Sequence, residues 1–312
     1  MGAITQRIDR ITRLTDDHRK AAPPIPKSVK IELTARCDFQ CFFCASHTRS
    51  RQKADMPREF FDRIVREMRE LGVEQLGVFY LGESFLYDWL PDAIRYAKQD
   101  CGYPYVFLTT NGRLANSDRV RECMLAGLDS LKFSVNFSSP EQFQEVTRLN
   151  ADEYHTVVSN LKDACWIRDY VEISTGHRCG LYASSLRYDD EQENRMQKIV
   201  AEILPFVDEH YYLPLYGHAG FPADVKSTAN QSRAGALCKP LPCWSLFTEG
   251  HITYDGHLSA CCFDHNSRFN MGDLNQMSFL EAWHSQQFQR LREAHLKQDV
   301  AGTVCEKCIA YA

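Results

Sequence analysis

The sequence predicts an α/β fold in which an open, partial β/α barrel of six strand–helix units is followed by a small cysteine-containing domain. From Val29 onward, short apolar runs alternate with stretches of helical periodicity, the pattern of parallel βαβ units. Cysteines gather in two sets, at 37–44 and at 238–308. The chain of 312 residues exceeds the commonest domain size, so we expect one large domain and one small one.

The elements follow from apolar alternation and helical spacing, taken in order. Residues 1–28 are expected to form a short helix and a proline-containing lead-in. The predicted strands are Val29–Leu33, Gln75–Tyr80, Tyr105–Thr109, Ser130–Val135, Val171–Thr175 and His210–Pro214. The predicted helices lie near 57–71, 88–99, 117–126, 140–168 with a break at Asn150, and 189–204. Residues 216–237 are predicted to be a linker, so the barrel covers 29–215 and the small domain covers 238–312.

Composition and charge exclude several classes of function. The net charge is −5, which gives no electrostatic case for binding nucleic acid or a membrane surface. The first 20 residues lack an apolar signal-peptide core, and no apolar run is long enough to span a membrane. Thirteen cysteines without a secretory signal favour metal binding or catalysis over disulfides, and we expect a cytoplasmic protein.

The chemistry is expected at Cys37, Cys41 and Cys44, which form a C-x3-C-x2-C run directly after the first predicted strand. Thiolates select zinc, Cu(I) and iron–sulfur clusters. A structural zinc site uses four protein ligands, whereas a [4Fe–4S] cluster held by three cysteines leaves one iron open to another ligand. A zinc knuckle completed by His47 is the alternative, and the position after a strand favours the cluster.

With an aromatic residue before its third cysteine, this run resembles that of the radical S-adenosylmethionine (radical SAM) enzymes. The resemblance implies a TIM-like partial (β/α)6 barrel that binds SAM and a [4Fe–4S] cluster held by Cys37, Cys41 and Cys44. In that family the open iron chelates the amine and carboxylate of SAM. One electron from the cluster then breaks a C–S bond, giving methionine and a 5′-deoxyadenosyl radical. The resemblance also implies a low-potential electron donor such as flavodoxin or ferredoxin.

The same resemblance assigns further SAM contacts to loops that follow later strands. Gly82 and Glu83 match a Gly-Gly-Glu motif whose carboxylate binds the SAM amino group, although Leu81 replaces the first glycine. A solvated turn is the alternative at this position. The pair Asn111–Gly112, after the third predicted strand, fits an ordinary turn as well as it fits a functional role. The other residues expected to contact SAM are Phe43, Ser134, Asn136 and Arg178.

The C-terminal set supplies four widely spaced thiols: Cys243, Cys261, Cys305 and Cys308. Four thiolates suit either structural zinc or a fully ligated [4Fe–4S] cluster. The C-x12-G-x4-C spacing resembles the SPASM domain, an auxiliary-cluster module of radical SAM enzymes. Because the sequence stops four residues after Cys308, it resembles the shortened twitch form with one auxiliary [4Fe–4S] cluster. Cys238 is a spare that could replace Cys243.

An auxiliary cluster with four cysteine ligands has no open iron for substrate. Its remaining roles are electron transfer and structural support. The short module also resembles that of radical SAM dehydrogenases of aminoglycoside biosynthesis, so we expect oxidation of a small, polar, hydroxylated substrate from alcohol to ketone. One alternative is a redox-neutral epimerase in which Cys179 or Cys262 returns a hydrogen atom. A peptide-modifying SPASM enzyme and a zinc-stabilised scaffold without chemistry are the others. Brown protein with about eight irons per chain would exclude the scaffold.

Overall fold

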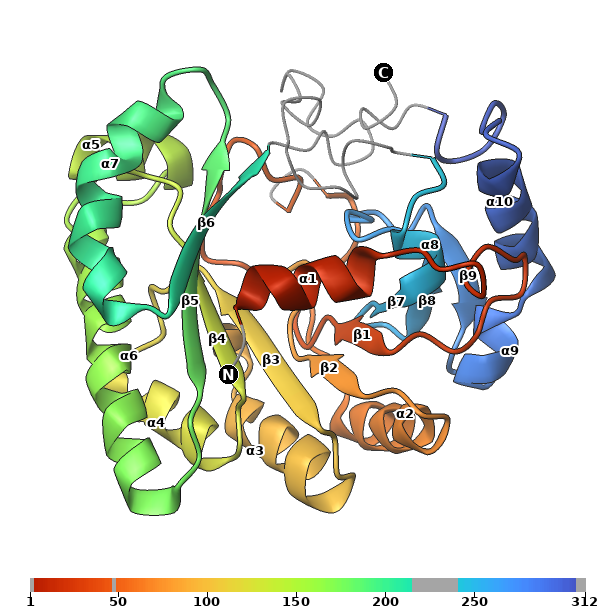
Figure 1. Cartoon of the computed structure of the whole chain (residues 1–312), viewed down its shortest axis with the longest axis horizontal. Coiled ribbons are helices and arrows are strands. Elements are labelled where there is room, and N and C mark those ends of the chain that lie inside the picture. The colour runs from red at the N-terminus through yellow and green to blue at the C-terminus, as the bar shows by residue number, and fades with distance from the viewer. Residues whose placement is uncertain (1–2, 47–48, 215–240, 307–312) are drawn as a thin grey trace.

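The computed structural model describes residues 3–46, 49–214 and 241–306 (Figure 1). Its strands are β1 (Ser28–Ile31), β2 (Gln75–Gly77), β3 (Tyr105–Thr110), β4 (Ser130–Ser134), β5 (Gly180–Arg187), β6 (Glu209–Pro214), β7 (Glu249–Ile252), β8 (His257–Ser259) and β9 (Asn270–Asp273). Its α-helices are α1 (Ile4–Thr12), α2 (Arg58–Glu70), α3 (Leu90–Arg95), α4 (Ser117–Leu125), α5 (Pro140–Thr147), α6 (Glu153–Thr175), α7 (Gln192–Ile203), α8 (Ser245–Thr248), α9 (Phe279–Trp283) and α10 (Gln286–Leu296). Short helical turns are η1 (Ser84–Leu86), η2 (Tyr96–Asp100) and η3 (Leu204–Phe206).

The described strands form one nine-stranded sheet in the order β6-β5-β4-β3-β2-β1-β7-β8-β9. Strands β1 to β6 all run parallel, each paired with the next strand of the chain. The structure therefore confirms the expected α/β fold with an open, partial barrel. Because the carboxyl ends of parallel strands meet at one edge, the loops after β1 to β6 lie together, where functional residues of such barrels gather.

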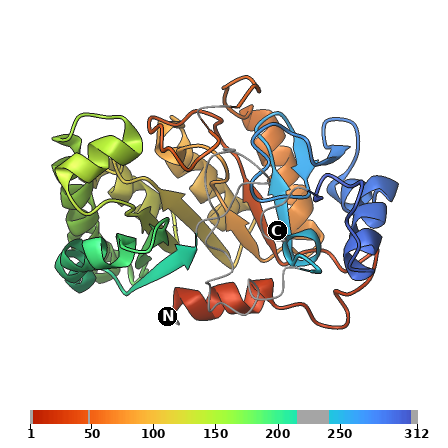
Figure 2. The ribbon, with the colours of Figure 1, turned by 90° about the horizontal axis from the view of Figure 1, so that it is seen from above.

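Helices α2 to α7 cover the convex face of the sheet, as Figure 1 shows. Helix α1 instead crosses the concave side, which is seen from above in Figure 2. Arg7 of α1 donates from Nε to Oε1 of Gln75 at 2.9 Å, and its guanidinium lies 3.9 Å from the centre of the Phe107 ring. Gln75 is the first residue of β2, so α1 closes the amino-terminal end of the concave space. We call this space the lumen.

The alternation of side chains along β4 determines which of them face the lumen. On β4, Leu131 and Phe133 are fully buried, and Phe133 lies beside Val157 of α6 against Gly112, on the helix side. Their neighbour Lys132 therefore faces the lumen, where its Nζ meets the hydroxyl of Tyr211 from β6 at 3.4 Å. None of the described helices combines the length and the apolar character that a membrane crossing requires.

The predicted fifth strand, Val171–Thr175, is wrong, because this segment is the last part of α6. Its alternating apolar residues resemble a strand, but Val171 is buried while Ile173 is 88% exposed. The helix ends where Gly176 takes the left-handed conformation with φ 74°, a common helix terminator. The fifth strand is β5, which begins at Gly180. This shift reverses the position of the residues between 176 and 179, which come before a strand instead of after one.

The C-terminal part continues the barrel sheet. Strand β7 pairs in parallel with β1, from Ser28 opposite Glu249 to Ile31 opposite Ile252. Strands β8 and β9 then add in antiparallel fashion. Trp283 of α9 is fully buried, and its Nε1 donates to the carbonyl of Pro24 at 3.0 Å. The lead-in to the barrel and the C-terminal part are therefore packed together.

Candidate functional site

The first cysteine set lies in the loop after β1, at the carboxyl edge of the sheet. Burial, followed by the charges of Glu83 and Cys44, raises the pKa of the Cys37 thiol. Burial, and then Cys44 and Cys37, raise the pKa of Cys41 well above its ordinary value. The three thiols thus act on one another, and without a cation their thiolates repel. A bound metal reverses this preference, because a coordinating thiol is deprotonated.

The spacing of these thiols bears on the kind of group they could hold. Among the described residues, no group of three or more His, Cys, Asp or Glu side chains is placed to hold one metal ion. The thiolates of a four-iron cluster each bind a different iron, so the ligands of a cluster need not converge on one point. His47, the fourth ligand of the alternative zinc knuckle, lies outside the described residues.

The loop after β2 packs directly against the cysteine loop at Gly82. A Cβ at Gly82 would lie 2.0 Å from the carbonyl oxygen of Thr34 and 2.7 Å from that of Arg36. The next residue, Glu83, donates its backbone N–H to the same Arg36 carbonyl at 2.8 Å. Only glycine permits this approach. The role that the structure gives Gly82 is to let the loop with Glu83 lie against the loop with the three cysteines.

Glu83 is a buried carboxylate held by neutral donors. Oε1 accepts hydrogen bonds from Phe85 N at 3.1 Å and Thr110 Oγ1 at 2.9 Å, and Oε2 accepts one from Asn111 N at 2.7 Å. No cation in the described part of the chain pairs with it. Burial raises the pKa of Glu83 to about 7, and the nearby charge of Asp38 adds to this while the backbone donors oppose it. Since a carboxylate offers about four acceptor positions, one remains for the N–H of a bound ammonium.

The turn after β3 has more than the conformational role that its Asn-Gly pair suggested. Asn111 donates from Nδ2 to Oδ1 of Asp38 at 2.7 Å, and Arg113 donates from Nη1 to Oδ2 of Asp38 at 3.3 Å. Asp38 follows the first cysteine directly. This turn therefore holds both Glu83 and the cysteine loop, a role that turn propensity alone did not predict.

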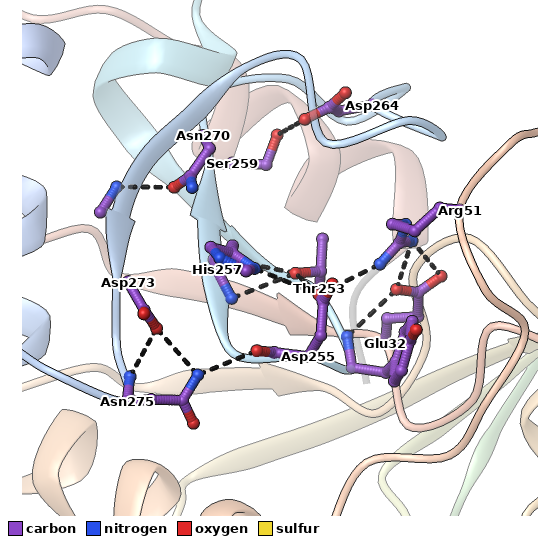
Figure 3. A network of polar contacts seen from close by, with 12 residues as sticks. Glu32, Arg51, Thr253, Asp255, His257, Ser259, Asp264, Asn270, Asp273 and Asn275 are labelled. Atoms are coloured by element: carbon purple, nitrogen blue, oxygen red, sulfur yellow. Dashed lines mark hydrogen bonds and ion pairs between the residues drawn. The ribbon is translucent and has the colours of Figure 1, made fainter.

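A buried ion network anchors the other end of the cysteine loop (Figure 3). Glu32, at the end of β1, binds Arg51 through both oxygens at 2.9 and 2.7 Å and Arg49 at 3.1 Å. Arg51 also reaches Asp255 at 3.2 Å, and the backbone N–H of Tyr254 donates to Glu32 at 3.1 Å. The β7–β8 turn thus holds the return segment of the cysteine loop. No sequence motif predicted this network.

Arg49 has donors that the described protein atoms do not satisfy. Its side chain is fully buried, and Nε and Nη2 have no hydrogen-bond partner. The charge of Cys44 is among those that act on this guanidinium. Buried donors of this kind ordinarily have partners. The unpaired N–H groups of these two nitrogens, near Cys44, therefore fit an acceptor that the protein atoms do not supply, such as the sulfur of a cluster.

Phe43 is packed within the protein. It is 5% exposed, and its ring stacks on that of Tyr188 with centroids 5.9 Å apart. The neighbouring Phe42 lines a pocket of about 590 Å³ together with Tyr188, Gln142 and Arg195. The pocket borders the cysteine loop. Tyr188 and Arg195 were missed because they follow the fifth strand, whose position the sequence did not reveal. An adenine contact by Phe43 itself remains a prediction.

Ser134 and Asn136 lie at and just beyond the carboxyl end of β4, on the expected edge of the sheet. Oδ1 of Asn136 accepts from the backbone N–H of Leu186 at 2.9 Å, and its carbonyl accepts from the Tyr188 hydroxyl at 3.3 Å. Asn136 therefore joins the ends of β4 and β5. Contacts of these two residues with SAM remain predictions.

Two expected site residues are on the wrong end of the barrel. Arg178 and Cys179 precede β5, at the amino-terminal edge of the sheet. Arg178 binds Glu172 through Nη1 at 2.5 Å and Asp208 through Nη2 at 2.9 Å. Cys179 is 1% exposed, and burial raises the pKa of its thiol well above the ordinary value. Neither a SAM contact for Arg178 nor hydrogen donation by Cys179 fits this position, because the loops with the three cysteines and Glu83 lie at the opposite edge of the sheet.

The second cysteine set is spread over the C-terminal part. Cys243 precedes α8 and Cys261 follows β8, while Cys305 follows α10 and is buried. Cys308 and the spare Cys238 lie outside the described residues. Tyr80, in the loop after β2, donates from its hydroxyl to the carbonyl of Cys261.

Cys262 lies next to the lumen. The charges of Lys30 and Glu249, which belong to β1 and β7, both act on its thiol. Of the two cysteines considered as hydrogen donors, only Cys262 is therefore on the side of the molecule where a substrate is expected.

Comparison with protein families gives two matches. Residues 31–175 match the model of the radical SAM superfamily, and residues 243–309 match that of the SPASM iron–sulfur cluster-binding domain. The first match includes Cys37, Cys41 and Cys44, and the second includes Cys243, Cys261, Cys305 and Cys308.

Two relatives illustrate the similarity in sequence. GTP 3′,8-cyclase of Chlorobaculum tepidum is 25% identical over 275 residues, which are 77% of this chain and 79% of that protein. A probable GTP 3′,8-cyclase of Saccharolobus solfataricus is 30% identical over 138 residues, 44% of this chain and 43% of that protein. This second alignment spans less than half of either protein.

Two solved structures share the fold. BtrN, in complex with AdoMet and 2-DOIA, superposes with a TM-score of 0.61 at 13% identity, covering 90% of this chain and 92% of that one. SuiB of Streptococcus suis, bound to the precursor peptide SuiA, gives a TM-score of 0.68 at 14% identity, covering 93% and 71%. At such identities the likeness concerns the fold alone.

Proposed function

Since the chain contains a radical SAM domain followed by a SPASM iron–sulfur cluster-binding domain, we propose that it oxidises an alcohol group of a hydroxylated small molecule to a ketone. Its cofactors are S-adenosylmethionine and [4Fe–4S] clusters. The contact between Tyr80 and Cys261 carries the proposal, because it joins the loop that leads to Glu83 to the second cysteine set. An electron acceptor held by that set would then lie close to the place of hydrogen abstraction.

We assign the cluster that binds SAM to Cys37, Cys41 and Cys44. We assign one auxiliary [4Fe–4S] cluster to Cys243, Cys261, Cys305 and Cys308. When bound, SAM and its cluster would supply a 5′-deoxyadenosyl radical, which takes a hydrogen atom from the substrate. The auxiliary cluster would supply an acceptor for the electron left on the substrate. Loss of the hydroxyl proton completes the two-electron conversion of alcohol to ketone.

The residues of the chain position the reactants. Glu83 carries a buried negative charge that lacks a cation, and we assign it to the ammonium of SAM. Thr110 and the backbone of Asn111 fix the orientation of its carboxylate. Ser134 stands at the mouth of the lumen, where we place the substrate. Closing this space around the substrate would exclude water and protect a reactive radical.

Location and electron supply follow from the same chemistry. Cluster thiolates require a reducing compartment, so we place the protein in the cytoplasm. We propose a low-potential flavodoxin or ferredoxin as the electron donor.

Isotope transfer tests this function. The reconstituted protein is incubated without oxygen with SAM, a reductant and hydroxylated substrates that carry deuterium on the carbinol carbon: polyols, amino sugars, sugar phosphates and sugar acids. Deuterium is expected in 5′-deoxyadenosine, together with an equal amount of ketone. Cys41→Ala should abolish both products. Cys101→Ala, outside the two cysteine sets, should leave both unchanged. If the wild type releases 5′-deoxyadenosine with no deuterium from any such substrate and no ketone, the oxidation is refuted.

The relatives favour a second candidate, a cyclisation of a purine nucleotide. The relative from Chlorobaculum tepidum, which aligns over most of this chain, bears the name GTP 3′,8-cyclase. Such a reaction would be seen in the same assay with GTP as the substrate. Consumption of GTP with a product of unchanged mass would favour the cyclase, whereas no reaction with GTP would favour the oxidation of another hydroxylated molecule.

A further inference from the structure

Three described cationic side chains face the lumen. Strand alternation directs Lys30 of β1 and Lys132 of β4 into it, and Arg7 of α1 enters from the amino-terminal end. The charges of Lys30 and Arg7 both act on Lys132, although β1 and β4 are separated by two strands in the sheet. The three cations therefore share one space.

The described carboxylates on this face are already engaged. Glu249 of β7 binds Lys30 Nζ at 2.7 Å and also accepts from Ser28 Oγ at 3.1 Å and His251 Nε2 at 3.2 Å. Glu209, the first residue of β6, accepts from Thr5 Oγ1 at 2.6 Å. Lys30 is thus a neutralised cation, held in place by Glu249.

Lys132 lacks such a counterion. Within the described ranges no carboxylate lies within ion-pair distance of its Nζ, and its hydrogen-bond partner is the neutral hydroxyl of Tyr211 at 3.4 Å. Its side chain is half-buried, so solvent still reaches it from the lumen. Burying an ammonium without a counterion is unfavourable. Burial and the neighbouring cations Lys30 and Arg7 accordingly lower the pKa of Lys132 to about 7.

We infer that the substrate carries an anionic group, a phosphate or a carboxylate, and that Lys132 binds this group inside the lumen. The site is one lumen-facing position below Ser134, which ends β4. An anion there would receive an N–H bond from Lys132 and an O–H bond from Tyr211, and it would supply the missing negative charge. This inference rests on the proposed function only in taking the lumen as the place of the substrate.

The opposing explanation is that Lys132 is a structural residue that no solute reaches. Amine acylation separates the two explanations without any radical chemistry. The reconstituted protein, kept free of oxygen and without SAM or reductant, is treated at neutral pH with the uncharged ester N-acetoxysuccinimide. The free amine attacks the ester carbonyl and forms an amide, and the proton that the amine loses leaves with the released N-hydroxysuccinimide. Mass spectrometry then compares the acylation rate of Lys132 with that of Lys162 on α6, whose side chain is 32% exposed and which serves as the reference.

Two arms distinguish the kinds of anion. One contains inorganic phosphate and the other lactate, each against chloride at equal ionic strength. An anion at about four times its Kd should slow acylation of Lys132 about fivefold and leave Lys162 unchanged. Protection by phosphate alone or by lactate alone supports the site and identifies its anion. Failure of both to protect, or equal slowing at both lysines, overturns the proposal.

Calorimetry provides an independent measurement. Titration of the protecting anion into wild type and Lys162→Met should give the same heat, which Lys132→Met should lose. Because none of these experiments uses SAM, the anion site stands or falls apart from the deuterium assay.

Discussion

The hydroxyl of Tyr80 donates a hydrogen bond to the backbone carbonyl of Cys261. The Tyr80 ring also lies 5.2 Å from the ring of His251 on β7. One side chain from the loop after β2 thereby contacts two segments of the C-terminal part. Gly82 and Glu83 follow in the same loop. A movement of the turn with Cys261 after β8 should therefore displace Glu83, whose carboxylate we expect to bind the ammonium of SAM.

Replacing this tyrosine should separate the two halves of the reaction. Tyr80→Phe removes the hydroxyl and leaves the Cys261 carbonyl with a weaker donor, the Ser259 hydroxyl at 3.3 Å. The expected cost is about 1 kcal/mol of stability. We expect the ratio of ketone to 5′-deoxyadenosine to fall, because SAM cleavage continues while the acceptor is displaced. Both products can be quantified by mass spectrometry in one anaerobic reaction.

Tyr103→Phe is the matched control. The Tyr103 hydroxyl also donates to a backbone carbonyl, that of Val65, at 2.8 Å, on the helical side of the barrel. Loss of the Tyr103 hydroxyl should lower Tm by about as much as loss of the Tyr80 hydroxyl does. The ratio of ketone to 5′-deoxyadenosine should not change. Equal ratios in the two variants would show that the Tyr80 contact is structural only.

Gly82→Ala should release the cluster that binds SAM. The new methyl group would collide with the carbonyls of Thr34 and Arg36, both in backbone that cannot give way as a side chain does. We expect a loss of about 1–3 kcal/mol and a fall in bound iron from about eight to about four per chain. Gly72→Ala is the control, since its φ of 97° is strained by any side chain while the space around it is open. It should lower Tm and keep its iron. Full iron in Gly82→Ala would contradict this role.

The sequence predicted local features better than positions that depend on the sheet. Cysteine spacing and the residues after the second strand are local signals, and the structure brings Cys37 and Glu83 together as expected. The prediction of the fifth strand was wrong because α6 has a strand-like apolar pattern at its end. For the same reason Arg178 and Cys179 lie at the edge of the sheet opposite to the predicted one.

Contacts between distant segments could not be read from the sequence at all. Glu32 binds Arg49 and Arg51, and the return of the chain to Tyr254 closes the same network. A single buried carboxylate gives no hint of which arginines will reach it. Only the pairing of β7 with β1 brings these segments together.

Arg49→Met should lower the reduction potential of the cluster that binds SAM. The buried guanidinium places positive charge and the unpaired N–H groups of Nε and Nη2 near Cys44, and both favour the more negative, reduced cluster. A fall of about 59 mV corresponds to a tenfold change for one electron. Potentiometric titration followed by electron paramagnetic resonance measures it directly.

Arg51→Met serves as the comparison for this variant. Arg51 binds the same Glu32 but extends to Asp255, away from the cysteine loop. It should lower Tm by at least as much as Arg49→Met, with a smaller change in potential. Equal potentials in wild type and Arg49→Met would exclude an interaction between Arg49 and the cluster.

Cys262→Ala distinguishes oxidation from epimerisation. If the thiol beside Lys30 and Glu249 returns a hydrogen atom, its loss should convert an inverted product into an oxidised one. Under the oxidation proposed here, the identity of the product should not change. Cys179→Ala, buried at the amino-terminal edge, should also leave it unchanged. Chiral chromatography of the products with each variant gives the answer.

The pH dependence of the free energy of unfolding should show the titration of Lys132. Burial and the charges of Lys30 and Arg7 lower its pKa from 10.5 to about 7, so between these values the unfolded chain binds a proton that the folded chain does not. Stability contributed by this group therefore rises with pH across that window, by at most about 1.4 kcal/mol per unit. Burial raises the pKa of the facing Tyr211, which keeps its hydroxyl neutral there.

Lys132→Met removes this titration along with the charge. Its Tm relative to wild type should be highest near pH 7, where the folded wild type still carries the unpaired ammonium, and the difference should shrink as pH rises toward 10. Glu249 does not interfere, because Lys30 and His251 hold its pKa well below the ordinary value although burial opposes them. Lys162→Met, which removes a surface ion pair with Glu202, should follow the wild type closely throughout. A constant difference between Lys132→Met and wild type over this range would mean that the lumen does not destabilise the Lys132 ammonium.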